Sequence, residues 1–237
     1  QNKNNSHNTK SKILFISQDR QWQEYKDFKK NETRKTDVFF DSMIKELEKY
    51  GYNTIGIYPI VHHPFIGLKV FFEKLRFWDT PHIPVNIYWS FKAFKKGIKS
   101  IKHYENLYKT LKSDKKFCNI CIYEHQNLHK KILDELQTCF LILMPHLIKY
   151  IEIQREMIKT EKPSLIIFLA EGFYWERSLL IAAKLENVPT VAIQHGIIQK
   201  YHKSYIMTKN ELFSEKSISC PIPDKTMVYG AKYKKLL

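Results

Sequence analysis

Glycine, proline and cysteine are all scarce in this sequence. Its 237 residues include only 7 glycines, 9 prolines and 4 cysteines, while 43% of the residues are hydrophobic. So little glycine and proline excludes a collagen-like or low-complexity chain. A chain of this size buries roughly 70% of its extended surface on folding. We therefore expect a folded protein with a large hydrophobic core.

The cysteines show neither a disulfide framework nor the spacing of a metal site. Cys118 and Cys121 make one C-x-x-C pair, whereas Cys139 and Cys220 stand alone. A structural zinc ion needs four ligands, and the chain offers no second pair and no nearby H-x-x-x-H. We expect reduced thiols and no metal ion.

Long apolar runs are also missing. The longest uninterrupted run is residues 139–145, well short of the ~20 residues that cross a bilayer. Residues 1–12 are polar and lack the apolar region of a signal peptide. We expect a soluble cytoplasmic protein, with peripheral contact at the inner face of the membrane as the further option.

Acidic residues are outnumbered by basic ones, 24 against 39, which gives a net charge of +15. Such a charge attracts polyanions: nucleic acid, anionic lipid headgroups or phosphorylated small molecules. No zinc-finger, RRM or KH signature is present, so nucleic acid is not an expected partner. The motifs of P-loop, dinucleotide-binding and serine-hydrolase proteins are absent too, and we expect no bound cofactor.

Short apolar runs alternate with helical patterns along much of the chain. Helices are expected at 37–50 and 174–186, with another beginning at 231. This alternation predicts an α/β fold, with a Rossmann-like, mostly parallel sheet flanked by helices. The predicted strands are 12–17, 53–58, 164–170, 189–194 and 226–229.

The domain organisation follows from the same pattern. Residues 1–11 are expected to be a disordered tail, and 12–230 one Rossmann-like domain with a largely helical insertion at about 60–160. Within the insertion, helical patterns cover 64–78, 86–112 and 126–160, the last with a possible kink at Pro145. Residues 231–237 are expected to start a linker or helix towards a second domain.

Ligands of open parallel sheets bind beyond the carboxyl ends of the strands, so the residues after each strand are the candidate site. His195 lies directly after the strand at 189–194, between Gln194 and Gly196. Imidazole titrates near neutral pH and can exchange a proton with a sugar hydroxyl. We predict that His195 is catalytic and that Gln194 and Gly196 bind substrate. The alternative is a histidine that bonds only to loop backbone.

Two further strand ends carry charged side chains. Asp19 is a candidate general base and Arg20 a candidate phosphate clamp, unless the two form only a solvated ion pair. Glu171 would repel a phosphate, so we predict that it binds substrate hydroxyls beside Gly172. The alternative is that Glu171 and Glu176 are merely acids at a helix start, where they are common.

Residues 64–111 interleave aromatic side chains with many lysines. This mixture suits the interface of an anionic membrane, and it would also suit stacking on single-stranded nucleic acid. The third interpretation is a pair of helices with aromatic cores and solvated lysines. All three stay open at this point.

The stretch 164–196, ending in Gln194-His195-Gly196, resembles the end of the N-terminal domain of GT-B glycosyltransferases that make capsules and surface polysaccharides. Residues 223–230 resemble the entry into their second domain, and the start at 12–17 is compatible with their first βα unit. Glycerophosphotransferases of teichoic-acid synthesis and UDP-N-acetylglucosamine 2-epimerases share this two-domain plan.

The resemblance implies a function for the chain. It would be the acceptor-side half of an enzyme that transfers a sugar from a nucleotide-sugar donor to a sugar or lipid-linked acceptor. The donor would bind through a second domain beyond Leu237, so this chain alone would be inactive. The alternatives are half of a 2-epimerase-like enzyme, or a non-catalytic basic module that docks on anionic membrane or on a partner protein.

Overall fold

The computed structural model describes residues 11–18, 21–27, 31–59, 82–169, 172, 174–199, 205, 207–212 and 220–235. Its centre is a six-stranded sheet in which every neighbouring pair of strands is parallel. In spatial order the strands are β5 (His82–Pro84), β4 (Asn53–Tyr58), β1 (Lys12–Ile16), β8 (Leu165–Leu169), β9 (Thr190–Ile193) and β10 (Lys225–Met227). Counted along the chain this order is 3-2-1-4-5-6, the order of doubly wound Rossmann folds. The predicted fold class is confirmed.

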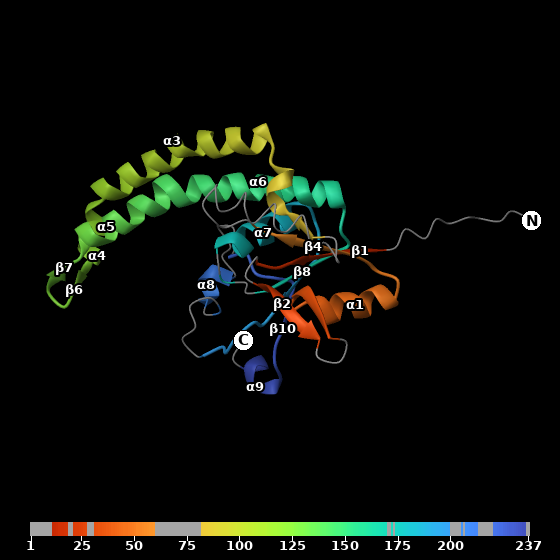
Figure 1. Ribbon diagram of the computed structural model, residues 1–237. Coiled ribbons are helices and arrows are strands. Elements are labelled where there is room, and N and C mark those ends of the chain that lie inside the picture. Colours follow the sequence, from red (N-terminus) through yellow and green to blue (C-terminus); the bar gives the residue numbers. More distant parts are fainter. Residues whose placement is uncertain are drawn as a thin grey trace, which may run out of the picture.

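The central strands are apolar without interruption because both faces of the sheet are covered. In β1, Leu14 and Ile16 belong to one buried cluster, while Ile13 and Phe15 belong to a second cluster on the opposite face. Helices α6 (Met144–Glu161) and α7 (Tyr174–Leu185) pack on the first face. Helix α1 (Asp41–Lys49) packs on the second through Ile44. The sheet therefore lies between two helical layers (Figure 1).

A helical arm projects from this core (Figure 1). One side is α3 (Phe91–Ser113), which follows the short helix η2 (Val85–Tyr88), and the other side is a continuous helix formed by α5 (His129–Thr138), the π-turn η3 (Cys139–Leu143) and α6. At the far end lie α4 (Lys115–Ile120) and a small hairpin of β6 (Ile122–Tyr123) and β7 (Gln126–Asn127). This arm is the described part of the predicted helical insertion; the helix expected at 64–78 lies outside the described residues.

Just before Pro145, where the sequence predicted a kink, the helix contains the π-turn η3. Proline has no N–H to donate, and in an α-helix its ring clashes with the carbonyl four residues earlier, here that of Leu141. Ahead of Pro145 the helix is wider, and the Met144 N–H donates to the carbonyl of Cys139, five residues earlier. The helix thus continues through the proline to Glu161 instead of ending there.

Several elements were not anticipated from the sequence, among them α4, the hairpin β6–β7, α8 (Lys209–Leu212) and three strands near the central sheet. An antiparallel hairpin of β2 (Trp22–Asp27) and β3 (Glu32–Asp37) follows β1, and β5 forms the sheet edge beside β4. Asp37, expected to cap a helix, ends β3 instead, and α1 begins at Asp41. Its carboxylate still accepts hydrogen bonds from the amides of Phe39 and Phe40, at 2.9 and 3.0 Å, so it orders the turn that leads into α1.

One helix bears on the prediction that the chain lacks apolar runs long enough to cross a bilayer. The combined helix His129–Glu161 is, by length and composition alone, long and apolar enough to cross a membrane. The sequence analysis considered only uninterrupted apolar runs, whereas a whole helix tolerates isolated charges, and core helices of soluble proteins share this length and composition. In the second half of this helix Ile153, Met157 and Ile158 are buried in the sheet-side core, an arrangement compatible with a soluble protein. A cytoplasmic location stays a prediction.

Candidate functional site

The site lies where the order of the strands reverses. Strands β4 and β5 extend the sheet on one side of β1, and β8, β9 and β10 extend it on the other side. In doubly wound folds the crevice at such a switch point, beyond the carboxyl ends of the strands, is where ligands bind. Here that edge carries Ser17 and Gln18 after β1, Gly172 after β8, and His195 after β9.

Gln18 and Glu176 meet across the switch point. The Gln18 side-chain amide donates a hydrogen bond to Glu176 Oε1 at 3.2 Å, although the two residues are 158 positions apart. The backbone N–H of Gln18 in turn donates to Gln21 Oε1 at 2.8 Å. The contact therefore joins the residue after Ser17 at the end of β1 to the first turn of α7.

Glu176 is a buried carboxyl with an unused acceptor. Its side chain belongs to a residue only 3% exposed, and no described residue bonds to its buried Oε2 atom. Burial raises the pKa of Glu176 to about 7, although hydrogen bonds from its own backbone N–H and from Gln18 oppose the rise. At neutral pH both protonation states are populated, so this carboxyl can donate or accept a hydrogen bond. Perturbed carboxyls of this kind concentrate at functional sites.

A second buried carboxyl lies on the opposite face of the same strand end. Successive residues of a strand point to opposite faces, so Ser17 bonds to Asp37 on the α1 side while Gln18 bonds to Glu176 on the α7 side. Burial raises the pKa of Asp37, opposed by the hydrogen bonds from Ser17, Phe39 and Phe40. Because Asp37 serves the turn before α1, we regard it as a structural group.

Gln194 shapes the loop that presents His195. Its side chain is fully buried; its Nε2 donates to the Gly196 carbonyl at 2.6 Å, and its Oε1 accepts from the Tyr229 amide at 2.9 Å. The ends of β9 and β10 are thereby joined through one side chain. His195 is exposed at the top of this loop, and a Cβ placed on Gly196 would meet no atom within 4 Å. Around Gly196 the described part of the chain thus leaves room for a side chain or a ligand atom.

The sequence-predicted residues fall into two groups. Gln194, His195, Gly196 and Gly172 all lie at the carboxyl edge of the sheet, as expected from their positions after the strands. Asp19, Arg20 and Glu171 lie outside the described residues, so their roles as base, phosphate clamp and hydroxyl ligand stay predictions.

Sequence reasoning treated Glu176 only as a helix-start acid and did not consider Gln18 as its partner. A signal for the burial of Glu176 was present, because Leu179, Leu180 and Ala183 lie three, four and seven positions further along α7 and share its face. An acid within an apolar stripe is expected to be buried. The partner across the sheet could not be read from sequence.

Three further hydrogen bonds attach the C-terminal segment to the rest of the fold, one at the first turn of α7 and two at the amino ends of β9 and β10, opposite the carboxyl edge. Arg177, also in the first turn of α7, donates to the carbonyl of Pro221. Asp224 accepts from both the backbone N–H and the hydroxyl of Thr190, at 2.7 and 2.8 Å. These contacts hold β10 beside β9 and so support the His195 loop.

Among the described residues, no group of three or more histidine, cysteine, aspartate or glutamate side chains could hold a metal ion. The described side chains at this edge supply an imidazole, a carboxyl near neutrality and side-chain amides. Such groups suit hydroxyl binding and proton transfer.

The chain was compared with protein-family models and with curated proteins, and it matches none of them.

Proposed function

We propose that this chain is the acceptor-side domain of a glycosyltransferase-like enzyme of cell-surface polysaccharide synthesis. The observation that carries the proposal is the Gln18–Glu176 pair, a buried carboxyl at the switch point of a Rossmann-like sheet, with one oxygen to which no described residue bonds. The choice of sugar transfer among hydroxyl chemistries rests on the resemblance of residues 164–196 and 223–230 to GT-B enzymes.

In the proposed reaction an acceptor hydroxyl attacks the anomeric carbon of a nucleotide sugar. A new C–O bond forms, the bond from the anomeric carbon to the nucleotide diphosphate breaks, and the diphosphate leaves with the electron pair. The proton of the acceptor hydroxyl must be taken up, and the exposed His195 imidazole is suited to this role. The nucleotide sugar itself would be held by a second domain.

Glu176 and Gln18 would lie beneath the bound acceptor and form hydrogen bonds that orient it. A carboxyl only 3% exposed can serve an incoming hydroxyl through a hydrogen bond but is poorly placed for exchange with bulk water. We therefore assign orientation of the acceptor to Glu176 and proton transfer to His195. Asp19 and Glu171 would add a second base and a hydroxyl ligand.

The test is sugar transfer by the full-length gene product. Membranes containing it are incubated with a panel of labelled nucleotide sugars, and label in polymer or lipid is measured. His195→Ala should lower the rate at least ~100-fold if the imidazole is the base, whereas His103→Ala, an exposed histidine on α3, should leave it unchanged.

Three outcomes would contradict the proposal. A near-normal rate of the His195→Ala variant would remove this residue from the mechanism. Absence of transfer from every nucleotide sugar would remove the function. Conversion of the donor to its 2-epimer without acceptor would instead favour the epimerase-like alternative.

A further inference from the structure

Helix α3 carries two apolar stripes, and only one of them is used for packing. Ala93 and Gly97 are buried against α6, where a Cβ on Gly97 would lie 3.1 Å from Lys149 Cβ. The second stripe is exposed to solvent. A helix of the protein core needs only the first, so the second calls for another explanation.

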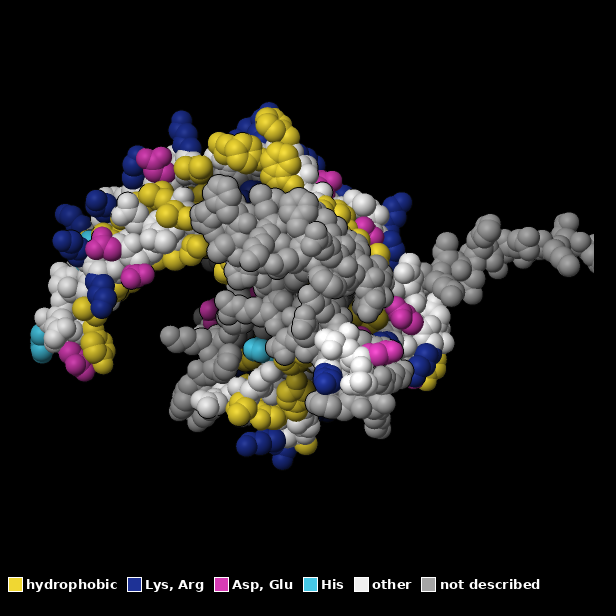
Figure 2. Space-filling model, viewed as in Figure 1, with side chains coloured by type: hydrophobic (Ala, Val, Ile, Leu, Met, Phe, Trp, Pro, Cys, Tyr) yellow, Lys and Arg dark blue, Asp and Glu magenta, His cyan; other side chains and the backbone are white. Residues whose placement is uncertain are grey.

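The exposed stripe, called here the aromatic stripe, consists of Trp89, Phe91, Phe94, Ile98 and Ile101. Their exposed fractions are 53%, 70%, 43%, 50% and 42%. The four helical members are spaced three, four and three residues apart, which places them on one face. Ring contacts join its aromatic members, since the Phe94 ring centroid lies 6.3 Å from that of Trp89 and 6.4 Å from that of Phe91. Figure 2 shows hydrophobic side chains gathered over the start of α3.

Positive charge accompanies the stripe. Helix α3 contains seven lysines and a single acidic residue, Glu105. Lysines on the α6 side are paired: Lys96 contacts Glu152 at 2.6 Å, and Lys92 lies 3.8 Å from Glu156.

The lysines that flank the aromatic stripe differ in this respect. Lys95 and Lys102 follow Phe91 and Ile98 by four positions, which places them beside these residues on the helix, and Lys99 adjoins them. All three are exposed, and within the described residues none forms an ion pair. Positive charge that forms no close ion pair among the described residues therefore borders the exposed apolar surface of α3, although Lys102 also interacts electrostatically with Glu105.

We propose that the aromatic stripe and its three flanking lysines dock the protein on an anionic lipid bilayer. Aromatic and aliphatic side chains enter the boundary between headgroups and acyl chains, while lysines bind anionic headgroups. A bilayer accounts for Ile98 and Ile101 as well as for the aromatic rings. Single-stranded nucleic acid would stack on rings but gains nothing comparable from aliphatic side chains. The proposal does not depend on sugar transfer, because binding to lipid requires no reaction.

The experiment is co-sedimentation of the intact chain with phosphatidylcholine vesicles, with and without phosphatidylglycerol. We expect binding that requires phosphatidylglycerol and weakens at least ~10-fold at high salt. The triple variant Phe91→Ser, Phe94→Ser, Ile98→Ser should bind at least ~10-fold more weakly. Unfolding curves show whether it retains the fold, as expected for exposed positions.

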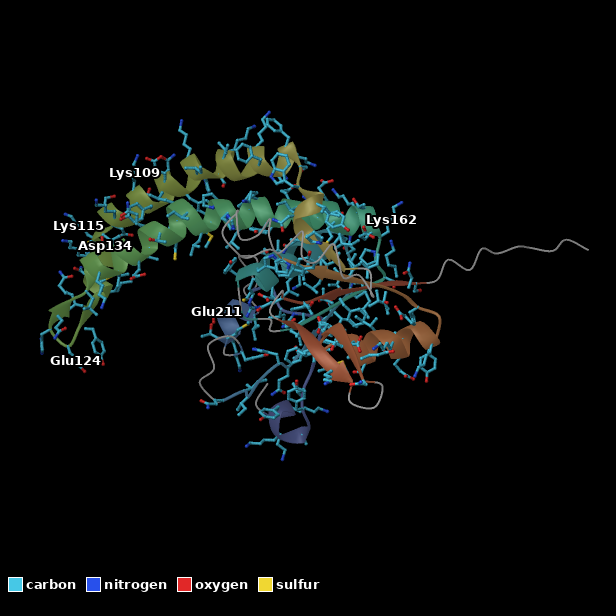
Figure 3. All side chains as sticks on the ribbon, in the orientation of Figure 1. Lys109, Lys115, Glu124, Asp134, Lys162 and Glu211 are labelled. Atoms are coloured by element: carbon cyan, nitrogen blue, oxygen red, sulfur yellow. The ribbon has the colours of Figure 1, made fainter. Side chains whose placement is uncertain are left out.

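Matched control variants distinguish binding through the aromatic stripe from nonspecific binding by other exposed apolar side chains or by net positive charge. Ile142→Ser with Leu143→Ser removes exposed apolar side chains from η3 and should leave binding unchanged. Lys95→Gln, Lys99→Gln, Lys102→Gln should reduce binding more than Lys109→Gln, Lys112→Gln, Lys115→Gln does. Both sets remove three charges, but Lys109 and Lys115 lie further out along the arm (Figure 3).

Several outcomes would overturn the proposal. Absence of sedimentation with either vesicle would do so, as would equal losses in the test and control variants. Binding to pure phosphatidylcholine that resists salt would point to insertion of the helix His129–Glu161 instead. Tighter binding to a single-stranded oligonucleotide, lost in the same variants, would assign the surface to nucleic acid.

Discussion

The burial of Glu176 suits its proposed hydrogen-bonding role but lowers the stability of the fold when the carboxyl is charged. Burial keeps its carboxyl near neutrality, which suits a hydrogen-bonding role at the switch point, but burying a carboxylate is unfavourable. Its ordinary pKa is 4.5, and its folded pKa is about 7. Between these values the folded state binds more protons than the unfolded state, so stability falls as pH rises through this window.

Replacing Glu176 by glutamine should therefore stabilise the protein in a pH-dependent manner. At pH 8 the variant should exceed the wild type by up to about 3 kcal/mol in free energy of unfolding, because the amide cannot ionise. Near pH 4 to 5 the difference should largely disappear. Urea unfolding across this range measures it.

The matched control is Glu135→Gln, since Glu135 is exposed on α5. It should leave the pH dependence of unfolding as in the wild type. A Glu176→Gln variant that loses stability equally at every pH would show that the carboxyl is an ordinary packing group, and its proposed role at the site would fail with it.

At the scale of elements, the close contact of α3 with α6 depends on one missing side chain. A Cβ on Gly97 would approach Lys149 Cβ to 3.1 Å and the Pro145 carbonyl oxygen to 3.2 Å. Glycine in a helix interior is unfavourable by itself, so its presence here is explained by the approach of the two helices.

The substitution Gly97→Leu should push the helices apart and cost about 1–3 kcal/mol of stability. Thermal or urea unfolding tests this, with Gly196→Ala as the control, because an added Cβ there meets nothing within 4 Å. Equal stability of Gly97→Leu and the wild type would mean that the arm adjusts freely.

The elements that the sequence predicted correctly share one property: their pattern reflects burial on known faces. Strand β8 is apolar throughout, and β1, β4 and β9 are mainly apolar after their first one or two residues, because both sheet faces are covered. The hairpin β2–β3 was missed because Trp22–Asp27 mixes polar and aromatic residues without regular alternation. The strand β5 has only three residues and ends in Pro84, so its sequence contains too little pattern to identify it.

The candidate site also divides into residues that the sequence predicted and residues that it did not. His195 and Gly172 could be placed from the rule that ligand sites lie after parallel strands. The pairing of Gln18 with Glu176 depends on β1 and β8 being neighbours, and strand order is a tertiary property that no local pattern specifies.

At the scale of the whole molecule, stability should be uneven. The sheet is enclosed by two buried clusters, whereas the outer arm has few buried residues, among them Cys121 and Leu133. Glu124, at the far end of the arm, lies well away from the core (Figure 3). Regions with little buried apolar surface open most easily.

The rate of hydrogen exchange should rise from the buried sheet to the tip of the arm. Backbone amides of β1 and β8 should exchange slowest, and those of 114–128 should exchange at least ~100-fold faster. Mass spectrometry of peptic fragments measures both in one experiment. Protection at the arm tip equal to that of β1 would show that a further contact stabilises the arm.

The π-turn before Pro145 determines how the outer half of the arm is rotated about the helix axis relative to the inner half. A π-turn accommodates one residue more than regular α geometry, and one residue corresponds to about 100° of rotation about the helix axis. The outer half, from His129 to Thr138, is thus turned relative to the inner half that anchors in the core. Deleting a single residue from Cys139–Leu143 would rotate the outer half about the helix axis by about 100° relative to the inner half, so that other side chains of His129–Thr138 would face α3.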